Sequence, residues 1–79
     1  MKIGIVGCAG RMGRMLVKAV LDTPGAELSG GTEAAHSDAI GEDPAVLAGL
    51  PASGIKIISD AKTLFEASDA VVDFTAPAA

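Results

Sequence analysis

Aromatic residues and cysteine are scarce in this chain. Its 79 residues include two phenylalanines and one cysteine, and neither tryptophan nor tyrosine occurs. With Cys8 alone, the chain can form neither an internal disulfide nor a cysteine-rich metal site, and we expect no metal. Although 49% of the residues are hydrophobic, the core has to be built from Val, Ile, Leu, Met and Ala. This composition is common in layered α/β folds.

Long apolar runs are also missing. No stretch approaches the roughly 20 residues that a helix needs to cross a bilayer, so we expect no membrane partner. The first predicted strand begins directly after Met1, which leaves no charged n-region or apolar h-region for a signal peptide. We therefore expect a cytoplasmic protein.

Basic residues are few, and their distribution along the chain is uneven. The formal net charge is −4, which argues against nucleic acid as a partner. Asp22, the first acidic residue, is preceded by four of the six basic residues, Lys2, Arg11, Arg14 and Lys18. A cationic end on an acidic protein suggests a local anionic ligand, although a solvated basic helix face would show the same pattern.

Four short apolar runs bounded by turn residues predict β-strands, at residues 2–6, 26–31, 55–59 and 70–74. Helical segments separate them, so the strands are expected to form βαβ units with parallel pairing. Right-handed crossovers then give the strand order 3-2-1-4. The sequence thus predicts an α/β fold, a Rossmann-like doubly wound parallel sheet that is truncated at about four strands.

Three helices are expected between these strands. A short helix over residues 43–50 begins with an Asp-Pro pair, and Asp60 caps another short helix in which Leu64 and Phe65 face inward. The first and longest helix covers residues 11–21. Its predicted buried face consists of apolar residues at helical spacing, Met12, Leu16, Ala19 and Val20.

The segment between the first strand and the first helix reads Gly7-Cys8-Ala9-Gly10-Arg11-Met12-Gly13. A strand-to-helix turn offers free backbone N–H groups and the positive end of a helix to a phosphate. Gly7 permits the turn, Gly10 leaves room for the ligand and Gly13 allows close packing of helix and strand. A turn that serves only this packing is the alternative. We expect Cys8 to point toward the phosphate region without acting as a nucleophile.

Two further features support an anionic ligand at this turn. Arg11 and Arg14 oppose the helix dipole, each by a few tenths to about 1 kcal/mol, which suggests a compensating anion. Glu33 lies about 20 residues beyond the turn, where an acid binds the adenosine ribose. The carboxylate of Glu33 would repel a 2′-phosphate unless a cation lay nearby. The next residue, Ala34, supplies none, and His36 is a cation only when protonated. Glu33 and Ala34 together favour NADH over NADPH.

Two stretches resemble a known family. V-G-C-A-G-R-M-G-R-M-L near the start and V-V-D-F-T-A-P near the end are similar to motifs of dihydrodipicolinate reductases, also called 4-hydroxy-tetrahydrodipicolinate reductases. The resemblance implies that residues 1–79 form the N-terminal NAD(P)-binding Rossmann domain, without the C-terminal substrate and tetramerisation domain. It implies an oxidoreductase of the diaminopimelate and lysine biosynthesis pathway that transfers hydride from NADH or NADPH to a cyclic unsaturated dicarboxylate. The whole enzyme is expected to be a homotetramer.

The resemblance also implies which residues contact the cofactor. The glycine turn corresponds to the phosphate-binding loop of the family, and Glu33 corresponds to its ribose-binding acid. Two residues of the second motif run beside the cofactor toward the nicotinamide. Many family members have an arginine for the 2′-phosphate directly after the acid, where this chain has Ala34. The implied cofactor-binding residues are Gly7, Cys8, Ala9, Gly10, Arg11, Met12, Glu33, Phe74 and Thr75.

No catalytic residue is expected within the chain. In the family, the proton donor and the dicarboxylate site belong to the second domain. Lys56, Lys62 and His36 have no motif context that would let them take these functions, so we expect the chain alone to be inactive. Two alternatives stay open from the residues themselves. One is a freestanding dinucleotide-binding module without chemistry, and the other is the first half of another NAD(P)-dependent reductase.

Overall fold

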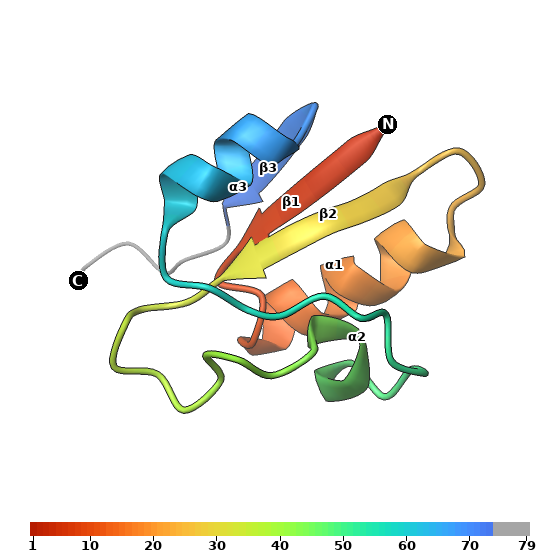
Figure 1. Cartoon of the computed structure of the whole chain (residues 1–79). Coiled ribbons are helices and arrows are strands. Elements are labelled where there is room, and N and C mark those ends of the chain that lie inside the picture. Colours follow the sequence, from red (N-terminus) through yellow and green to blue (C-terminus); the bar gives the residue numbers. More distant parts are fainter. Residues whose placement is uncertain (74–79) are drawn as a thin grey trace.

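A computed structural model describes residues 1–73, in which a parallel sheet lies between two layers of helices (Figure 1). The helix α3 packs on one face of the sheet, whereas α1 and α2 lie on the other (Figure 1). The predicted α/β class with parallel strands is thus confirmed. In chain order the elements are β1 (Lys2–Val6), α1 (Arg11–Asp22), β2 (Glu27–Thr32), α2 (Pro44–Leu47), α3 (Ala61–Ala67) and β3 (Ala70–Asp73).

The predicted order of four strands, 3-2-1-4, is wrong in that residues 55–59 do not form a strand, whereas the other three strands lie in the predicted order. The described sheet has three strands in the order β2-β1-β3, and residues 55–59, predicted as a strand beside β2, form only an isolated bridge between Ile58 and Thr32. At Ile57 the backbone pairs on its opposite side instead, donating to Glu42 O at 2.8 Å and accepting from Gly41 N at 2.9 Å. Residues 55–59 are thus hydrogen-bonded on both sides, but they pair with β2 at a single bridge, which is too short to form a ladder.

The buried face of α1 is turned away from the predicted one. Gly13, Val17 and Val20 are buried, whereas Met12 and Ala19, predicted to lie inside, are exposed. Because Gly13 has no side chain, the helix comes closest to the preceding turn there, and this contact sets its rotation. The core between α1 and the sheet is an apolar cluster of Ile5, Cys8, Val17, Val20, Leu28 and Ile57.

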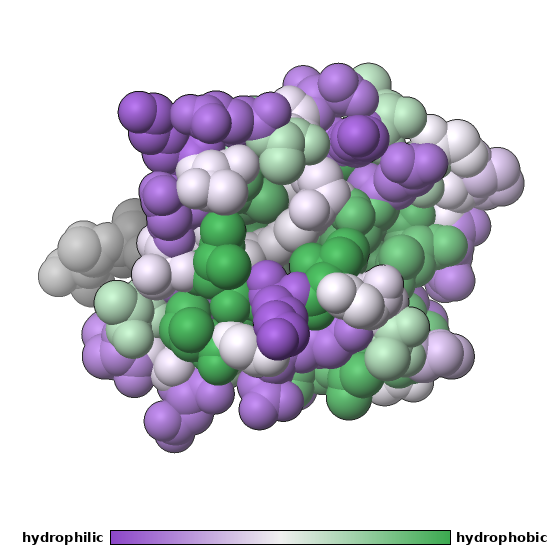
Figure 2. All heavy atoms as spheres, in the orientation of Figure 1, coloured by the Kyte–Doolittle hydropathy of each residue, from purple (hydrophilic) through white to green (hydrophobic). Residues whose placement is uncertain are grey.

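On the other face of the sheet, α3 places Leu64 above two glycines. A Cβ at Gly4 would lie 2.6 Å from Leu64 Cδ1, and one at Gly30 would lie 3.0 Å from it. Leu64 is buried as predicted, but Phe65, also predicted to face inward, is 56% exposed. The glycines leave space for one large side chain, and the next residue of the helix points elsewhere. Hydrophilic side chains dominate the region of α3 in Figure 2.

The two short helices begin at the aspartates that the sequence predicts. Asp43 and Asp60 each accept a hydrogen bond from the backbone N–H two residues further on, at 2.9 and 3.0 Å. α2 ends at Leu47, earlier than the predicted residue 50, because Gly49 takes a left-handed conformation (φ 84°) and closes a Schellman motif. Among residues 1–73, no helix is long and apolar enough to span a bilayer.

Candidate functional site

The turn between β1 and α1, residues 7–10, folds against the end of β2. Gly7 has a φ of 80°, a left-handed conformation that favours glycine. The backbone N–H groups of Gly7 and Cys8 donate to Thr32 O at 2.9 and 3.3 Å, and Gly10 N donates to Gly7 O at 3.2 Å. The turn therefore stands at the carboxyl ends of two neighbouring parallel strands, where open α/β sheets bind ligands.

The N-terminus of α1 is uncapped, unlike those of α2 and α3. Its N-cap residue, Gly10, offers no side chain, and the first turn of the helix contains no acidic residue. No acceptor among residues 1–73 pairs with the backbone N–H groups of Arg11, Met12 or Gly13. Unpaired N–H groups and the positive end of the helix dipole are the features with which helix N-termini bind anions.

Gly10 and Gly13 differ in their surroundings. Gly10 is exposed, and within the described part of the chain a Cβ there would have one neighbour within 4 Å, Gly7 O at 3.4 Å. A Cβ at Gly13 would meet Gly7 O and lie 2.7 Å from the Cα of Cys8. The geometry agrees with open room at Gly10 and close packing at Gly13, as the sequence indicated.

Glu33 brings a carboxylate from the end of β2 to the glycine turn. Its Oε2 accepts a hydrogen bond from Ala9 N at 2.8 Å, and the side chain is half-buried. The backbone N–H of Glu33 donates to Ile58 O at 3.0 Å, which fixes the start of the side chain. The structure thus brings together Glu33 and the turn, the two features that the sequence associates with a dinucleotide.

Cys8 does not point toward the phosphate region, and the prediction on its direction is wrong. Its side chain is fully buried, and its Sγ lies 3.7 Å from Thr32 O. Gly31 leaves the space that the thiol fills, since a Cβ there would lie 2.5 Å from Sγ. Burial, together with the negative charge of Glu33, raises the pKa of the Cys8 thiol to about 12. The thiol is therefore neutral near pH 7 and belongs to the core.

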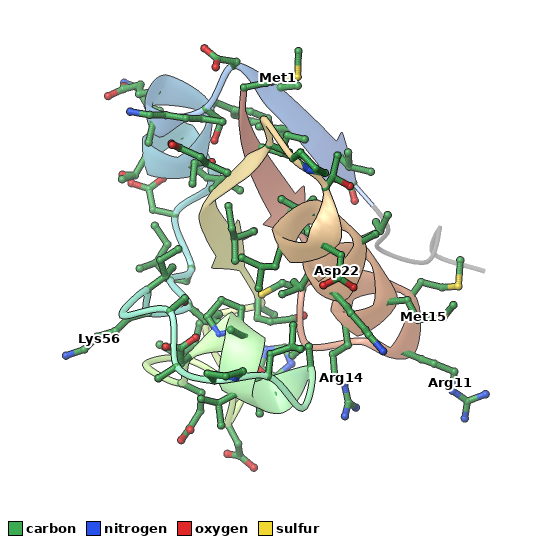
Figure 3. All side chains as sticks on the ribbon, turned by 90° about the vertical axis from the view of Figure 1, so that its right-hand side faces the viewer. Met1, Arg11, Arg14, Met15, Asp22 and Lys56 are labelled. Carbon is green, nitrogen blue, oxygen red and sulfur yellow. The ribbon has the colours of Figure 1, made fainter. Side chains whose placement is uncertain are left out.

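Arg14 connects the basic side of α1 to the glycine turn. Its Nε donates to Ala9 O at 3.0 Å, so Ala9 is held through its N–H by Glu33 and through its carbonyl by Arg14. Figure 3 shows Arg14 extending beside α2, with Arg11 projecting from the same end of α1. Sequence reasoning missed this contact. An arginine in the first turn of a helix can reach back to the loop before it, and this spacing could have indicated the contact.

The other residues singled out from the sequence lie elsewhere. Phe74 and Thr75 are outside the described residues. His36 is exposed in the loop after Glu33, and Lys56 and Lys62 are exposed, with Lys62 on α3 across the sheet. Within residues 1–73, no group of three or more His, Cys, Asp or Glu side chains is arranged to hold a metal ion.

Known proteins match the chain over its whole length. The family model described as "Dihydrodipicolinate reductase, N-terminus" matches residues 1–79. The 4-hydroxy-tetrahydrodipicolinate reductase of Bradyrhizobium sp. (strain ORS 278) is 48% identical over 79 residues, which are 100% of this chain and 29% of the relative. That of Anaplasma marginale (strain St. Maries) is 48% identical over 77 residues, 98% of this chain and 30% of the relative. That of Rhizobium meliloti is 42% identical over 77 residues, 98% of this chain and 32% of the relative.

The chain thus spans less than a third of the length of these curated relatives. The matched region includes both the glycine turn and Glu33. Because the family model matches every residue, the chain belongs to the dihydrodipicolinate reductase family and corresponds to the N-terminal part of its members.

Proposed function

We propose that residues 1–79 are the NAD(P)H-binding part of a 4-hydroxy-tetrahydrodipicolinate reductase. The observation that carries this proposal is the uncapped N-terminus of α1 next to the carboxylate of Glu33. The family match and the names of the relatives support it. In this proposal, the substrate-binding domain and the contacts of a homotetramer belong to the part of the enzyme that lies beyond the region matched by this chain.

The glycine turn and the start of α1 hold the pyrophosphate. Its oxygens accept hydrogen bonds from the N–H groups of Arg11 and Met12, and the exposed surface at Gly10 lets it approach the backbone. The backbone of Gly7, Cys8 and Ala9 shapes the turn, which is already fixed by hydrogen bonds to Thr32 and Glu33. The positive helix end offsets the negative charge of the pyrophosphate.

Glu33 holds the adenosine ribose. An ionised carboxylate accepts about four hydrogen bonds, so the contact from Ala9 N leaves acceptors for the ribose hydroxyls. The charge of Glu33 repels a 2′-phosphate, and Ala34 supplies no cation directly after it. NADH should therefore bind at least as tightly as NADPH. From the resemblance, Phe74 and Thr75 run beside the cofactor toward the nicotinamide.

The reaction needs groups that residues 1–73 do not supply. Bound NADH or NADPH provides the hydride, which in the whole enzyme goes to a cyclic unsaturated dicarboxylate of diaminopimelate and lysine biosynthesis. A proton donor and a dicarboxylate site are also required. Cys8 is buried and neutral, and Lys56 and Lys62 lie apart from the glycine turn. We therefore propose that the chain binds the cofactor but is inactive alone.

Calorimetric titration of the chain with NADH and NADPH tests the proposal, with Gly10→Asp as the decisive variant. Gly10 has the extended N-cap conformation (φ −71°, ψ 167°), which suits an aspartate. The new carboxylate would cap the free N–H groups of α1 and repel the pyrophosphate. We expect binding to be lost while the free energy of unfolding stays the same or rises by a few tenths of a kcal/mol.

Ala67→Asp is the matched control, because it adds the same charge to an exposed position of α3 across the sheet. It should leave the affinity for both dinucleotides unchanged. Equal affinity of Gly10→Asp and the original chain for NADH would contradict the proposal, as would the absence of binding by the folded original chain.

A further inference from the structure

A groove runs along the outer side of α1 where this helix meets α2. It has a volume of about 340 Å³ and is lined by Arg11, Arg14, Met15, Lys18, Leu47 and Ala48. Three of these six residues are cations from successive turns of α1, and Leu47 and Ala48, at the end of α2, are apolar. Arg11 belongs both to this groove and to the uncapped N-terminus of α1, where the proposed cofactor site uses backbone N–H groups.

The three cations of the groove have no ion-pair partner among residues 1–73. The other lysines among residues 1–73 have no ion pair either, so the grouping of these three cations along one helix is what sets them apart. Cations at i, i+3 and i+7 on one helix repel each other, and two of them also oppose the helix dipole. Arg14 is held in place by the bond from its Nε to Ala9 O, which leaves the N–H groups of its two Nη atoms for another acceptor. The cluster therefore presents hydrogen-bond donors and positive charge that no carboxylate among residues 1–73 neutralises.

We propose that this groove binds the phosphate monoester group of a ligand. Guanidinium groups donate in a planar fork that matches phosphate oxygens, and a lysine adds a point charge. A phosphate dianion accepts from Arg11, Arg14 and Lys18 together, and Met15, Leu47 and Ala48 contact the apolar part of the molecule that carries it. The volume lies near the lower end of ligand sites, which suits a phosphate with a sugar or a single ring attached.

Two sources of such a phosphate fit the groove. One is the 2′-phosphate of NADPH, because Arg14 and Glu33 contact the same residue, Ala9, from opposite ends of its backbone. This source rests on the proposed cofactor site, and it would reverse the preference for NADH expected from Glu33 and Ala34. Arg14 would then act in place of the arginine that Ala34 replaces. The other source is a separate phosphorylated small molecule. Both sources present the same group, a phosphate monoester, to the three cations.

Nuclear magnetic resonance of the isotopically labelled chain tests the proposal with inorganic phosphate as the probe. Phosphate is titrated at constant ionic strength, because salt screens exposed charges within about 10 Å at 0.1 M. The signals to follow are the Arg14 Nε–H and the methyl groups of Met15, Leu47 and Ala48. The titration is done in Gly10→Asp, in which the helix N-terminus is blocked, so that failure of the proposed cofactor site does not affect the result.

We expect saturable shifts of these signals and an affinity that falls roughly tenfold in Arg14→Gln and in Lys18→Gln. Lys62→Gln removes an exposed lysine across the sheet and should change nothing. Shifts that do not saturate, or that are equally strong in Arg14→Gln, would overturn the proposal. So would shifts that vanish in Gly10→Asp but persist in the original chain carrying Arg14→Gln, because the phosphate would then occupy the helix N-terminus alone.

Titrating the original chain with NADH and NADPH then separates the two sources. If NADPH shifts the groove signals and NADH does not, the 2′-phosphate occupies the groove. If inorganic phosphate shifts them and neither dinucleotide does, the groove serves a separate phosphorylated molecule. Both results support the phosphate site, since each requires saturable binding that depends on Arg14 and Lys18.

Discussion

Replacing Gly13 by alanine tests how closely α1 is packed on the glycine turn. The new Cβ would meet Gly7 O and lie 2.7 and 2.9 Å from the Cα and the carbonyl carbon of Cys8. Non-bonded carbon atoms rest at about 3.5 Å or more, so the closest carbon pair overlaps by roughly 0.8 Å. All three neighbours are backbone atoms, which cannot rotate away. The helix has to move outward and withdraw Val17 from the core.

The cost follows from two opposing terms. Overpacking a core destabilises a protein by about 1–3 kcal/mol, and the backbone neighbours put this variant at the upper end. Alanine regains up to about 1 kcal/mol through its higher helix propensity. We therefore expect Gly13→Ala to lower the free energy of unfolding by about 2 kcal/mol. For a chain of 79 residues, this corresponds to a fall in Tm of about 8–16 °C.

Urea denaturation followed by circular dichroism measures the change, and Gly10→Ala is the matched control. The nearest atom to a Cβ at Gly10 is 3.4 Å away, an ordinary contact, so this variant should lose less than about 1 kcal/mol, mainly through a poorer N-cap. A free energy of unfolding of Gly13→Ala within about 0.5 kcal/mol of that of the original chain would contradict close packing at this position. Equal destabilisation of Gly10→Ala and Gly13→Ala would contradict it as well.

Three further predictions concern other parts of the fold. Burial raises the pKa of Cys8 from 9.0 to about 12, so as the pH rises the thiol ionises in the unfolded chain before it does in the folded one. Urea melts should therefore show a free energy of unfolding that falls above about pH 9 by up to about 1.4 kcal/mol per pH unit. Cys8→Ala should lack this slope, and equal slopes would contradict the burial argument. Leu64→Ala should lose about 2–5 kcal/mol in the same assay, whereas Phe65→Ala should lose less than about 1 kcal/mol; similar losses would contradict the orientation of α3. Desolvation raises the pKa of Asp43, but hydrogen bonds from Ser53 and from backbone N–H groups outweigh it and hold the pKa below its usual 3.8. Asp43 therefore stabilises the fold above that pH and loses its contribution as the pH falls further, so Asp43→Asn should flatten the acid limb of the stability curve; an unchanged limb would count against these contacts.

The sequence predicted correctly those features that depend on neighbouring residues. β1 has the predicted bounds, and α1 and β2 lie within one residue of theirs. Asp43 and Asp60 begin helices as expected, because an aspartate caps the N–H groups that follow it directly. The glycine turn is also local, since its first glycine supplies the left-handed conformation that joins strand to helix.

Other features depend on contacts between segments far apart in the chain. Cys8 turns inward because Gly31, on another strand, leaves space for its thiol. Phe65 points outward because Gly4 and Gly30 accommodate Leu64 alone. The sequence alone does not show which distant side chain packs against each of these glycines. The pairing of residues 55–59 with β2 at a single bridge is likewise set by contacts with segments far apart in the chain.

Ala9 is contacted from both sides, by Glu33 and by Arg14, and these contacts give Glu33 a second function. The sequence assigns Glu33 to the ribose alone, but in the structure the same carboxylate also fixes the glycine turn through Ala9 N, while Arg14 fixes it through Ala9 O. A turn held from both sides has its binding geometry before a ligand arrives, which lowers the entropy lost on binding. Removing Glu33 therefore loosens the turn as well as the ribose contact. Weaker dinucleotide binding in such a variant would not by itself assign Glu33 to the ribose, whereas a change in the ratio of NADH to NADPH affinity would, because only the ribose contact differs between the two cofactors.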